Sequence, residues 1–269
     1  MSSPDLDYPG HLARESAMFA HAVGLAAPNA AVPSCPGWNA DDLLWHLGEV
    51  QWFWNTILRQ GVLTTAQAQG LERPERPSDR AGLLTFFTTV SGELGGALAA
   101  AAPGTPAWTW SDDHTVGFIR RRQAHEALIH RVDAELTAGD RTAMDPQLSA
   151  DGIDEALRIM YGGDVPSWGT FEADETRTMR IRATDTGDSW LVRLGRFSGT
   201  DPQDSKTHDQ AGIQVPQADP GTAATATVTG PAADLDCWLW RRPPLTLLDR
   251  YGDQGTLAAF DAVIAEGIS

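Results

Sequence analysis

Glu126 and His130 lie four residues apart in the segment AHEALIHRVDAE, residues 124–135. Residues four apart on an α-helix project from the same face, so both side chains can reach one atom. A carboxylate and an imidazole are ligand types that zinc and similar divalent ions accept. The same spacing also occurs on solvated helix faces, so the pair alone leaves an exposed polar face as an alternative.

His46 strengthens the metal hypothesis because it falls in register with the apolar residues Leu43, Leu47, Val50 and Trp54. This register places the histidine on the inward face of an amphipathic helix. A lone inward histidine is usually a hydrogen-bonded core residue, but a buried carboxylate on another helix needs a charged or hydrogen-bonded partner. We therefore expect a divalent ion, with zinc as the expected metal, to be held by His46, Glu126 and His130, with an open position suited to catalysis.

Other charged residues surround this set of three in the sequence. Asp133, one turn beyond His130, is a candidate for orienting a ligand, although a surface cap or ion pair fits its position as well. His125 points about 100° away from Glu126 and is interpreted as a structural residue or as one that supports a metal ligand. Arg122, one turn before Glu126, belongs to a solvated face or contacts the site or an anionic substrate.

The first 140 residues contain four long amphipathic segments separated by stretches rich in Pro, Gly and polar residues, which is typical of a four-helix bundle. Asn39 is the candidate N-cap of the second helix, and Gly61 is its candidate stop. Trp108 and Trp110, in the loop before the last helix, either pack in the core or line a pocket. The predicted helices cover about residues 10–27, 40–60, 79–102 and 114–138.

The pattern changes after about residue 145, so the sequence predicts a helical domain over 1–145 and an α+β domain over 146–269. In the second part, TRTMRIRAT and SWLVRLG joined by DTGD predict a β-hairpin. The other predicted elements are a helix near 149–161, a long polar loop at about 197–222, a strand ATATVTG, a helix PAADLDCWLWRR and a last helix around 255–267.

Composition excludes several classes of protein. The formal charge of −16 repels polyphosphate backbones, so nucleic acid is not expected as a partner. No apolar run approaches the roughly 20 residues that span a bilayer, and the start MSSPDLDYPGHLARES lacks the order of a secretion signal. Cys35 and Cys237 are too few for a disulfide framework. These features predict a cytoplasmic protein with no membrane partner.

Three segments together resemble one known family: VPSCPGWNADDLLWHLGEVQWFW, WTWSDDHTVGFIRRRQAHEALIHRVDAE and GPAADLDCWLWRRPP. The chain resembles the mycothiol-dependent maleylpyruvate isomerase family of the DinB-like metalloenzyme superfamily over nearly its whole length. The resemblance implies a multi-domain α and α+β fold, with an N-terminal DinB-like four-helix bundle followed by a smaller α+β domain. The family's metal ligands fall on His46, Glu126 and His130, whereas Gln51 stands where many relatives have another histidine.

The resemblance also implies a thiol cosubstrate, mycothiol or a similar low-molecular-weight thiol, and a small electrophilic substrate. A metal-activated thiolate would then carry out S-transfer or conjugation, or assist cis-trans isomerisation. The family's arginine from the second domain falls on Arg242, with Arg241 as the alternative, and a guanidinium suits a substrate carboxylate. Cys35 falls on a position that has a structural role in the family. The competing interpretation is a metal-binding DinB-like protein without thiol chemistry, either a non-catalytic binder or a Lewis-acid enzyme acting on a specialised metabolite.

Overall fold

A computed structural model describes residues 6–163, 165–202, 204–217 and 221–267 of the chain. The chain divides into two compact units, residues 1–142 and 143–269. The first five residues of the N-terminal segment MSSPDLDYPGHLARES, which was tested for the order of a secretion signal, lie outside the described residues. Residues 203 and 218–220 of the expected polar loop do so as well.

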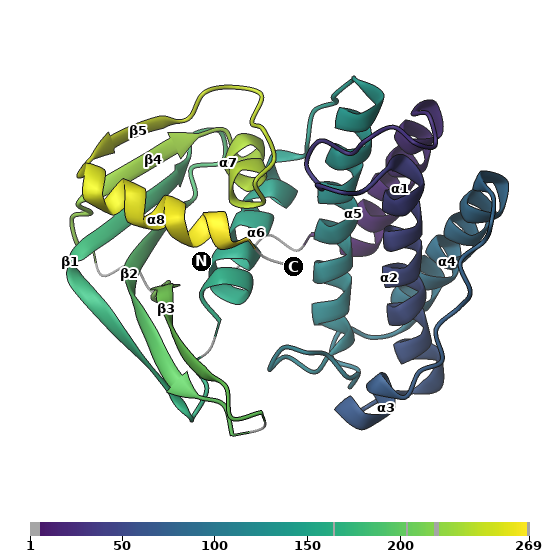
Figure 1. Ribbon diagram of the computed structural model, residues 1–269, viewed down its shortest axis with the longest axis horizontal. Helices are drawn as coiled ribbons and strands as arrows, with labels where there is room; N and C mark the ends of the chain where they lie inside the picture. Colours follow the sequence, from purple (N-terminus) through teal and green to yellow (C-terminus); the bar gives the residue numbers. More distant parts are fainter. Residues whose placement is uncertain (1–5, 164, 203, 218–220, 268–269) are drawn as a thin grey trace. The chain divides into compact units, whose positions relative to one another are not determined.

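The first unit is a bundle of four long helices with one short helix beside it (Figure 1). α1 packs mainly on α5, and α2 packs mainly on α4. The predicted four-helix bundle is therefore confirmed, and the short α3 is an element that the sequence pattern did not indicate. The helices are α1 (Tyr8–Leu25), α2 (Ala40–Gln60), α3 (Thr65–Gln69), α4 (Arg80–Ala100) and α5 (Val116–Ala138).

The ends of α2 are set by the residues predicted to flank it. The Asn39 side chain accepts a hydrogen bond of 2.9 Å from the backbone N–H of Asp42, whose carboxylate accepts one of 3.1 Å from the backbone N–H of Asn39. This capping box satisfies N–H groups at a helix start. Gly61 ends the helix in the left-handed conformation, at φ 62°, which glycine adopts without steric cost. The two caps fix the span that carries His46.

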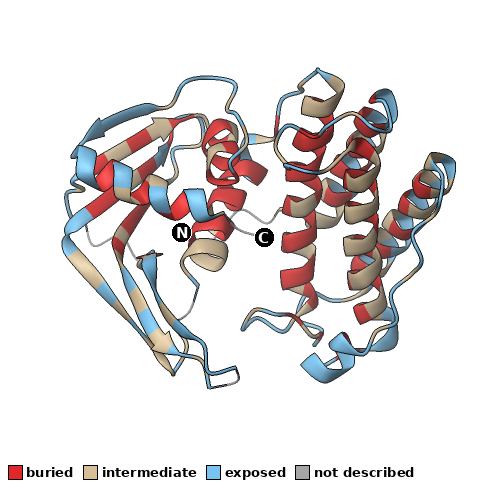
Figure 2. Ribbon diagram, viewed as in Figure 1, coloured by how far each residue is buried: buried red, intermediate tan, exposed pale blue. Residues whose placement is uncertain are grey.

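α5 is buried along most of its length (Figure 2). Its Arg131 is fully buried and forms ion pairs with Glu15 of α1, at 2.6 Å, and with Glu135 one turn further along α5, at 2.9 Å. The side chains of Glu126 and His130 are only 18% and 10% exposed. The alternative of a solvated face is therefore wrong for this pair.

α4 corrects the expectation that no segment is long and apolar enough to cross a membrane. By length and composition alone this helix passes that test. Its large buried side chains form one stripe within the bundle, whereas its exposed positions carry small or polar residues and Glu93. A helix surrounded by lipid would be apolar on all sides. The pattern of α4 is therefore that of a bundle helix. The stripe consists of Leu83, Phe87, Val90, Leu94 and Leu98.

The second unit contains one mixed five-stranded sheet in the order β3-β2-β1-β4-β5. β1 pairs parallel with β4, and the other neighbouring strands are antiparallel. The predicted hairpin is confirmed as β1 and β2, and the predicted α+β class is confirmed. The elements are α6 (Pro146–Glu155), which continues as a π-helical turn (Ala156–Tyr161), β1 (Gly169–Ala183), β2 (Ser189–Thr200), β3 (Thr207–Gln214), β4 (Ala226–Gly230), α7 (Ala232–Leu239), β5 (Asp249–Gly252) and α8 (Gln254–Glu266).

The predicted long loop at 197–222 is wrong in part, because β2 runs to residue 200 and β3 occupies residues 207–214. β3 is an edge strand whose side chains are mostly exposed, so it lacks the alternation of apolar and polar residues that marks a half-buried strand. β5, the other edge strand, is exposed at every position and was not predicted. Backbone pairing stabilises both strands without a pattern in the side chains.

Candidate metal centre

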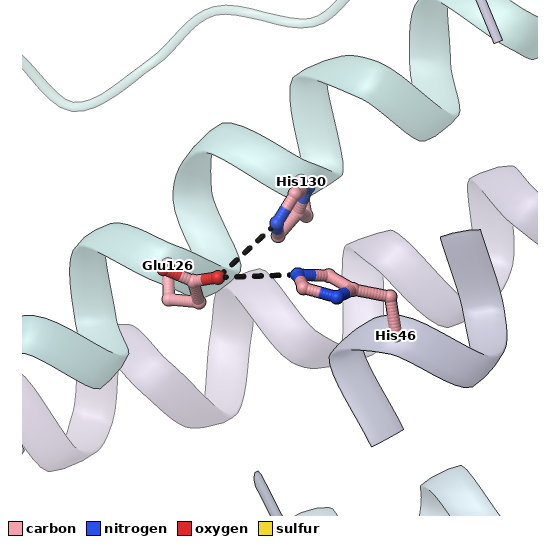
Figure 3. A group of neighbouring side chains, drawn as sticks. All are labelled: His46, Glu126 and His130. Carbon is pink, nitrogen blue, oxygen red and sulfur yellow. Dashed lines mark hydrogen bonds and ion pairs between the residues drawn. The ribbon is translucent and has the colours of Figure 1, made fainter. Parts of the chain in front are cut away.

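His46, Glu126 and His130 come together between α2 and α5 (Figure 3). The Nε2 atom of His46 lies 3.6 Å from Oε1 of Glu126, and the Nε2 atom of His130 lies 3.2 Å from the same oxygen. One ligand atom from each side chain lies within 4.8 Å of the other two. Within the part of the chain that the structure describes, this is the one group of three or more such side chains with that geometry.

The spacing of these atoms fits a divalent ion. Two ligand atoms bound about 2.1 Å from a tetrahedral zinc ion are separated by about 3.4 Å. The two observed separations from Oε1 bracket that value. His46 is also 32% exposed, so the set of three is accessible on its α2 side. Three protein ligands and an accessible side are the arrangement of a catalytic rather than a structural zinc site.

Asp133 holds the far side of the His130 ring. The Nδ1 atom of His130 lies 2.9 Å from Oδ2 of Asp133, which is fully buried. Ser34 and Cys35, in the loop before α2, donate hydrogen bonds to the same carboxylate, the latter from Sγ at 3.6 Å. A carboxylate bound to Nδ1 keeps the proton there and directs the lone pair of Nε2 towards a metal. Asp133 therefore has the geometry of a residue that orients a ligand and not that of a surface cap.

Arg122 binds the second oxygen of Glu126. Its Nη2 atom donates to Oε2 at 2.6 Å, and the Arg122 side chain is only 5% exposed. The solvated-face interpretation of Arg122 is therefore wrong. Because Oε2 is held by the guanidinium, Oε1 is the oxygen that faces both histidines. A divalent ion, two carboxylates and one guanidinium would give the enclosed site a net charge of about +1.

The protonation of the site follows from these contacts. Burial raises the pKa of Glu126, but the charge of Arg122 and the hydrogen bonds from His130 and His46 outweigh it and hold that pKa well below its usual range. Burial lowers the pKa of His130, but Asp133 and Glu126 outweigh it and raise the pKa to about 9. Without a metal, His130 is thus an imidazolium that donates from both ring nitrogens. A metal at Nε2 would take the place of one of these protons.

The other sequence candidates have separate surroundings. Gln51 is buried and donates from Nε2 to the Ser16 hydroxyl at 3.0 Å, so its contact lies with α1. His125 is buried, and its ring meets the edge of Tyr8. Trp38, which was not considered from the sequence, packs against the ring of His46 with 4.7 Å between centroids. Trp38 lies in the loop directly before α2, and this closeness to His46 in the sequence could have indicated the contact.

Arg242 lies just after α7 in the second unit, where its Nη1 atom donates to the backbone carbonyl of Trp240 at 2.6 Å. The neighbouring Arg241 has a φ of 61°, in the left-handed region that residues other than glycine seldom adopt. Asp234, also missed from the sequence, accepts hydrogen bonds from the backbone N–H groups of Leu245 and Thr246 and fixes the segment that follows the arginines. The role of Arg242 towards a substrate stays a prediction.

Asp133→Asn should weaken the binding of zinc by about 10- to 100-fold, because the amide keeps the size of the carboxylate but no longer fixes the orientation and basicity of His130. Competition with a chromophoric chelator measures this affinity. Asp140→Asn, at an exposed position, serves as the control and should bind as the unmodified protein does. Equal affinity in Asp133→Asn would show that the carboxylate does not support a ligand.

Comparisons with known proteins cover both units. The family model described as the mycothiol maleylpyruvate isomerase N-terminal domain matches residues 10–135, and that described as the MDMPI C-terminal domain matches residues 147–259. A crystal structure of the mycothiol-dependent maleylpyruvate isomerase is 13% identical, with 93% of this chain and 95% of that chain covered and a TM-score of 0.55. A structure of a mutant of that enzyme is 12% identical, with coverages of 87% and 89% and a TM-score of 0.49. No curated protein sequence was found to match the chain. The first of the two structures supports the fold described above.

Proposed function

The chain belongs to the mycothiol maleylpyruvate isomerase family, and on that premise we propose that it is a metal-dependent enzyme in which a thiol attacks a small electrophile. The thiol is mycothiol or a similar low-molecular-weight thiol, and the metal is zinc. The observation that carries this proposal is the convergence of His46, Glu126 and His130 on one half-open point, supported by Asp133. The proposed setting is the cytoplasm, with a small molecule as the substrate.

The residues of the site have distinct tasks. His46, Glu126 and His130 would hold the ion, Asp133 would keep the Nδ1 proton of His130 in place, and Arg122 would hold the second oxygen of Glu126. A bound divalent ion supplies positive charge that lowers the pKa of a thiol and so provides a thiolate near neutral pH. The His46 side chain is 32% exposed, which would leave a thiol a route to a bound ion.

The thiolate sulfur then forms a bond to an electrophilic carbon. In a cis-enone, the electron pair of the double bond moves to the carbonyl oxygen and the remaining single bond rotates. Return of that electron pair expels the sulfur and gives the trans isomer. If the adduct is stable or a different group leaves, the outcome is conjugation or S-transfer. The family models name an isomerase, and conjugation or S-transfer would use the same thiolate at the same site.

A metal-binding protein without thiol chemistry is the competing proposal, and thiol dependence separates the two. The experiment determines the metal content of the purified protein and then measures turnover of several electrophiles with and without mycothiol. The proposed enzyme should contain about one ion per chain and should act only when the thiol is present. A fully loaded protein that shows no thiol-dependent turnover with any electrophile would favour a binder or a Lewis-acid enzyme.

Arg242→Ala should lower kcat/KM by about ten- to a hundredfold, or roughly 1.5 to 3 kcal/mol, if this arginine holds a substrate carboxylate. The metal content should not change. Arg242→Lys should restore activity only in part, because an ammonium group does not reproduce two parallel hydrogen bonds. Steady-state kinetics check both variants. If Arg242→Ala is fully active and Arg241→Ala loses most activity, Arg241 is the residue that holds the substrate carboxylate. If neither variant loses activity, no arginine of this segment holds it.

A further inference from the structure

An apolar stripe continues along α2 from the candidate metal ligand. Val50 and Phe53 follow His46 by four and seven residues, which places all three on one face of the helix. With a rise of 1.5 Å per residue, Val50 and Phe53 lie about 6 Å and about 10 Å from His46 along the helix axis. All three side chains are half-buried and reach solvent. Val50 and Phe53 pack against the core cluster that contains Trp54, and neither is fully buried.

The tryptophan-bearing loop before α5 extends this stripe. The Trp108 ring meets Phe53 edge to face, with 5.9 Å between centroids. Trp108 is held in place by its backbone N–H, which donates to the Val62 carbonyl at 2.8 Å, and by its Nε1 atom, which donates to the Thr65 hydroxyl at 3.1 Å. One hydrogen bond thus holds the backbone of Trp108 and the other holds its ring, and the residue remains half-buried.

Trp110 adds a more exposed ring to the same loop. It is 48% exposed and rests edge to face on Phe118, with 5.2 Å between centroids. Phe118 is buried and lies eight residues before Glu126, on the ridge of α5 that passes through Arg122. The Thr109 hydroxyl donates to backbone carbonyls of Ser111 and Asp113, which fixes the turn that presents Trp110.

Trp108 packs against the core, where its ring stacks on that of Trp54 with 6.2 Å between centroids. Trp54 and Phe118, which these residues contact, are themselves buried. Phe53 and Trp108 remain half-buried on the outer side of this packing, Trp110 is exposed, and fixed neighbours contact all three. Rigid aromatic surface next to a polar site is typical of a small-molecule binding site, where it accommodates the apolar part of the ligand.

We propose that Val50, Phe53, Trp108 and Trp110 form an aromatic wall that binds a planar apolar group, such as an aryl ring, on the electrophilic substrate. This inference rests on the proposed function, because it assigns the wall to the substrate that meets the thiol at the metal centre. Val50 and Phe53 lie about 6 and about 10 Å from His46 along the helix axis, which is the range of a ring attached next to the reacting carbons.

A matched pair of substrates tests the wall in the zinc-loaded protein with mycothiol. The aryl substrate is (Z)-4-oxo-4-phenylbut-2-enoate, and the methyl substrate is (Z)-4-oxopent-2-enoate, so both are cis-enone carboxylates. The unmodified protein should prefer the phenyl ketone by about tenfold or more in kcat/KM, beyond the ratio of their uncatalysed reactions with the thiol. Trp110→Ala should reduce that preference by about three- to tenfold, the range of one aromatic contact, and Trp110→Phe should retain most of it.

Binding of unreactive analogues provides a readout that does not depend on turnover. Calorimetric titration should show that 4-oxo-4-phenylbutanoate binds more tightly than 4-oxopentanoate, and that Trp110→Ala or Phe53→Leu removes most of the difference. Leu25→Ala, which removes an exposed apolar side chain of α1 outside the wall, should leave the difference unchanged. Equal binding of the two analogues to the unmodified protein would overturn the aromatic wall. Preferential binding of the phenyl analogue without thiol-dependent turnover would instead overturn the proposed reaction and leave the wall intact.

Discussion

His130→Ala should reduce the affinity of the protein for zinc by at least about a hundredfold. The loss of a residue that only supports a metal ligand already costs about 10- to 100-fold, and His130 is itself in the position of a ligand. The substitution removes the Nε2 atom that lies 3.2 Å from Glu126 and also leaves Asp133 without its bond to Nδ1. Elemental analysis of the purified variant and a chelator competition measure the effect.

His21→Ala provides the control for this experiment, because His21 is an exposed histidine on the same bundle. It should bind zinc as the unmodified protein does. Circular dichroism should show that both variants keep the helical signal of the bundle. Full occupancy and unchanged affinity in a folded His130→Ala protein would contradict the assignment of this histidine as a ligand.

Arg131→Ala should lower the free energy of unfolding by about 3 to 5 kcal/mol, since it leaves buried carboxylates without their partner. Glu15 and Glu135 both pair with this guanidinium, and each of the three residues is at most 5% exposed. Arg131 follows His130 directly, and its ion pair with Glu15 links the ligand-bearing helix α5 to α1. Urea unfolding followed by circular dichroism gives the change in stability.

Arg59→Ala is the matched comparison for this prediction. Arg59 pairs with Glu93 at 3.3 Å, but their side chains are 66% and 45% exposed. Water screens such a pair, so its loss should change the unfolding free energy by about 0.5 kcal/mol or less. If Arg131→Ala cost no more than Arg59→Ala, the buried ion pairs would not stabilise the bundle.

The three candidate ligands could be proposed from the sequence because their signals are local or periodic. The spacing of Glu126 and His130 follows from helix geometry, and the register of His46 follows from its apolar neighbours. The contact of Asp133 with Ser34 could not be found in this way, because 99 residues separate the two in the chain. Local spacing placed Arg122 one turn before Glu126, but it did not decide between a solvated face and the buried bond to Glu126 that the structure contains.

The same distinction applies to the fold. The long helices of the bundle carry repeated apolar positions and recognisable caps, so their bounds were predicted to within a few residues. The hairpin of β1 and β2 was recognised from its alternating residues and its turn. The edge strands β3 and β5 were not recognised from the sequence, because each pairs along one side only and exposes most or all of its side chains. Backbone pairing with a distant segment stabilises them and leaves no periodic pattern in the sequence.

Replacement of zinc with Co²⁺ tests most directly whether the site of His46, Glu126 and His130 brings a metal and a thiol together. Addition of mycothiol to the cobalt-substituted protein should produce a sulfur-to-cobalt charge-transfer band, and His130→Ala should not show it. The same thiol should then support turnover of the cis-enone substrates. A fully loaded cobalt protein whose spectrum is unchanged at saturating mycothiol would contradict thiol activation at this metal centre.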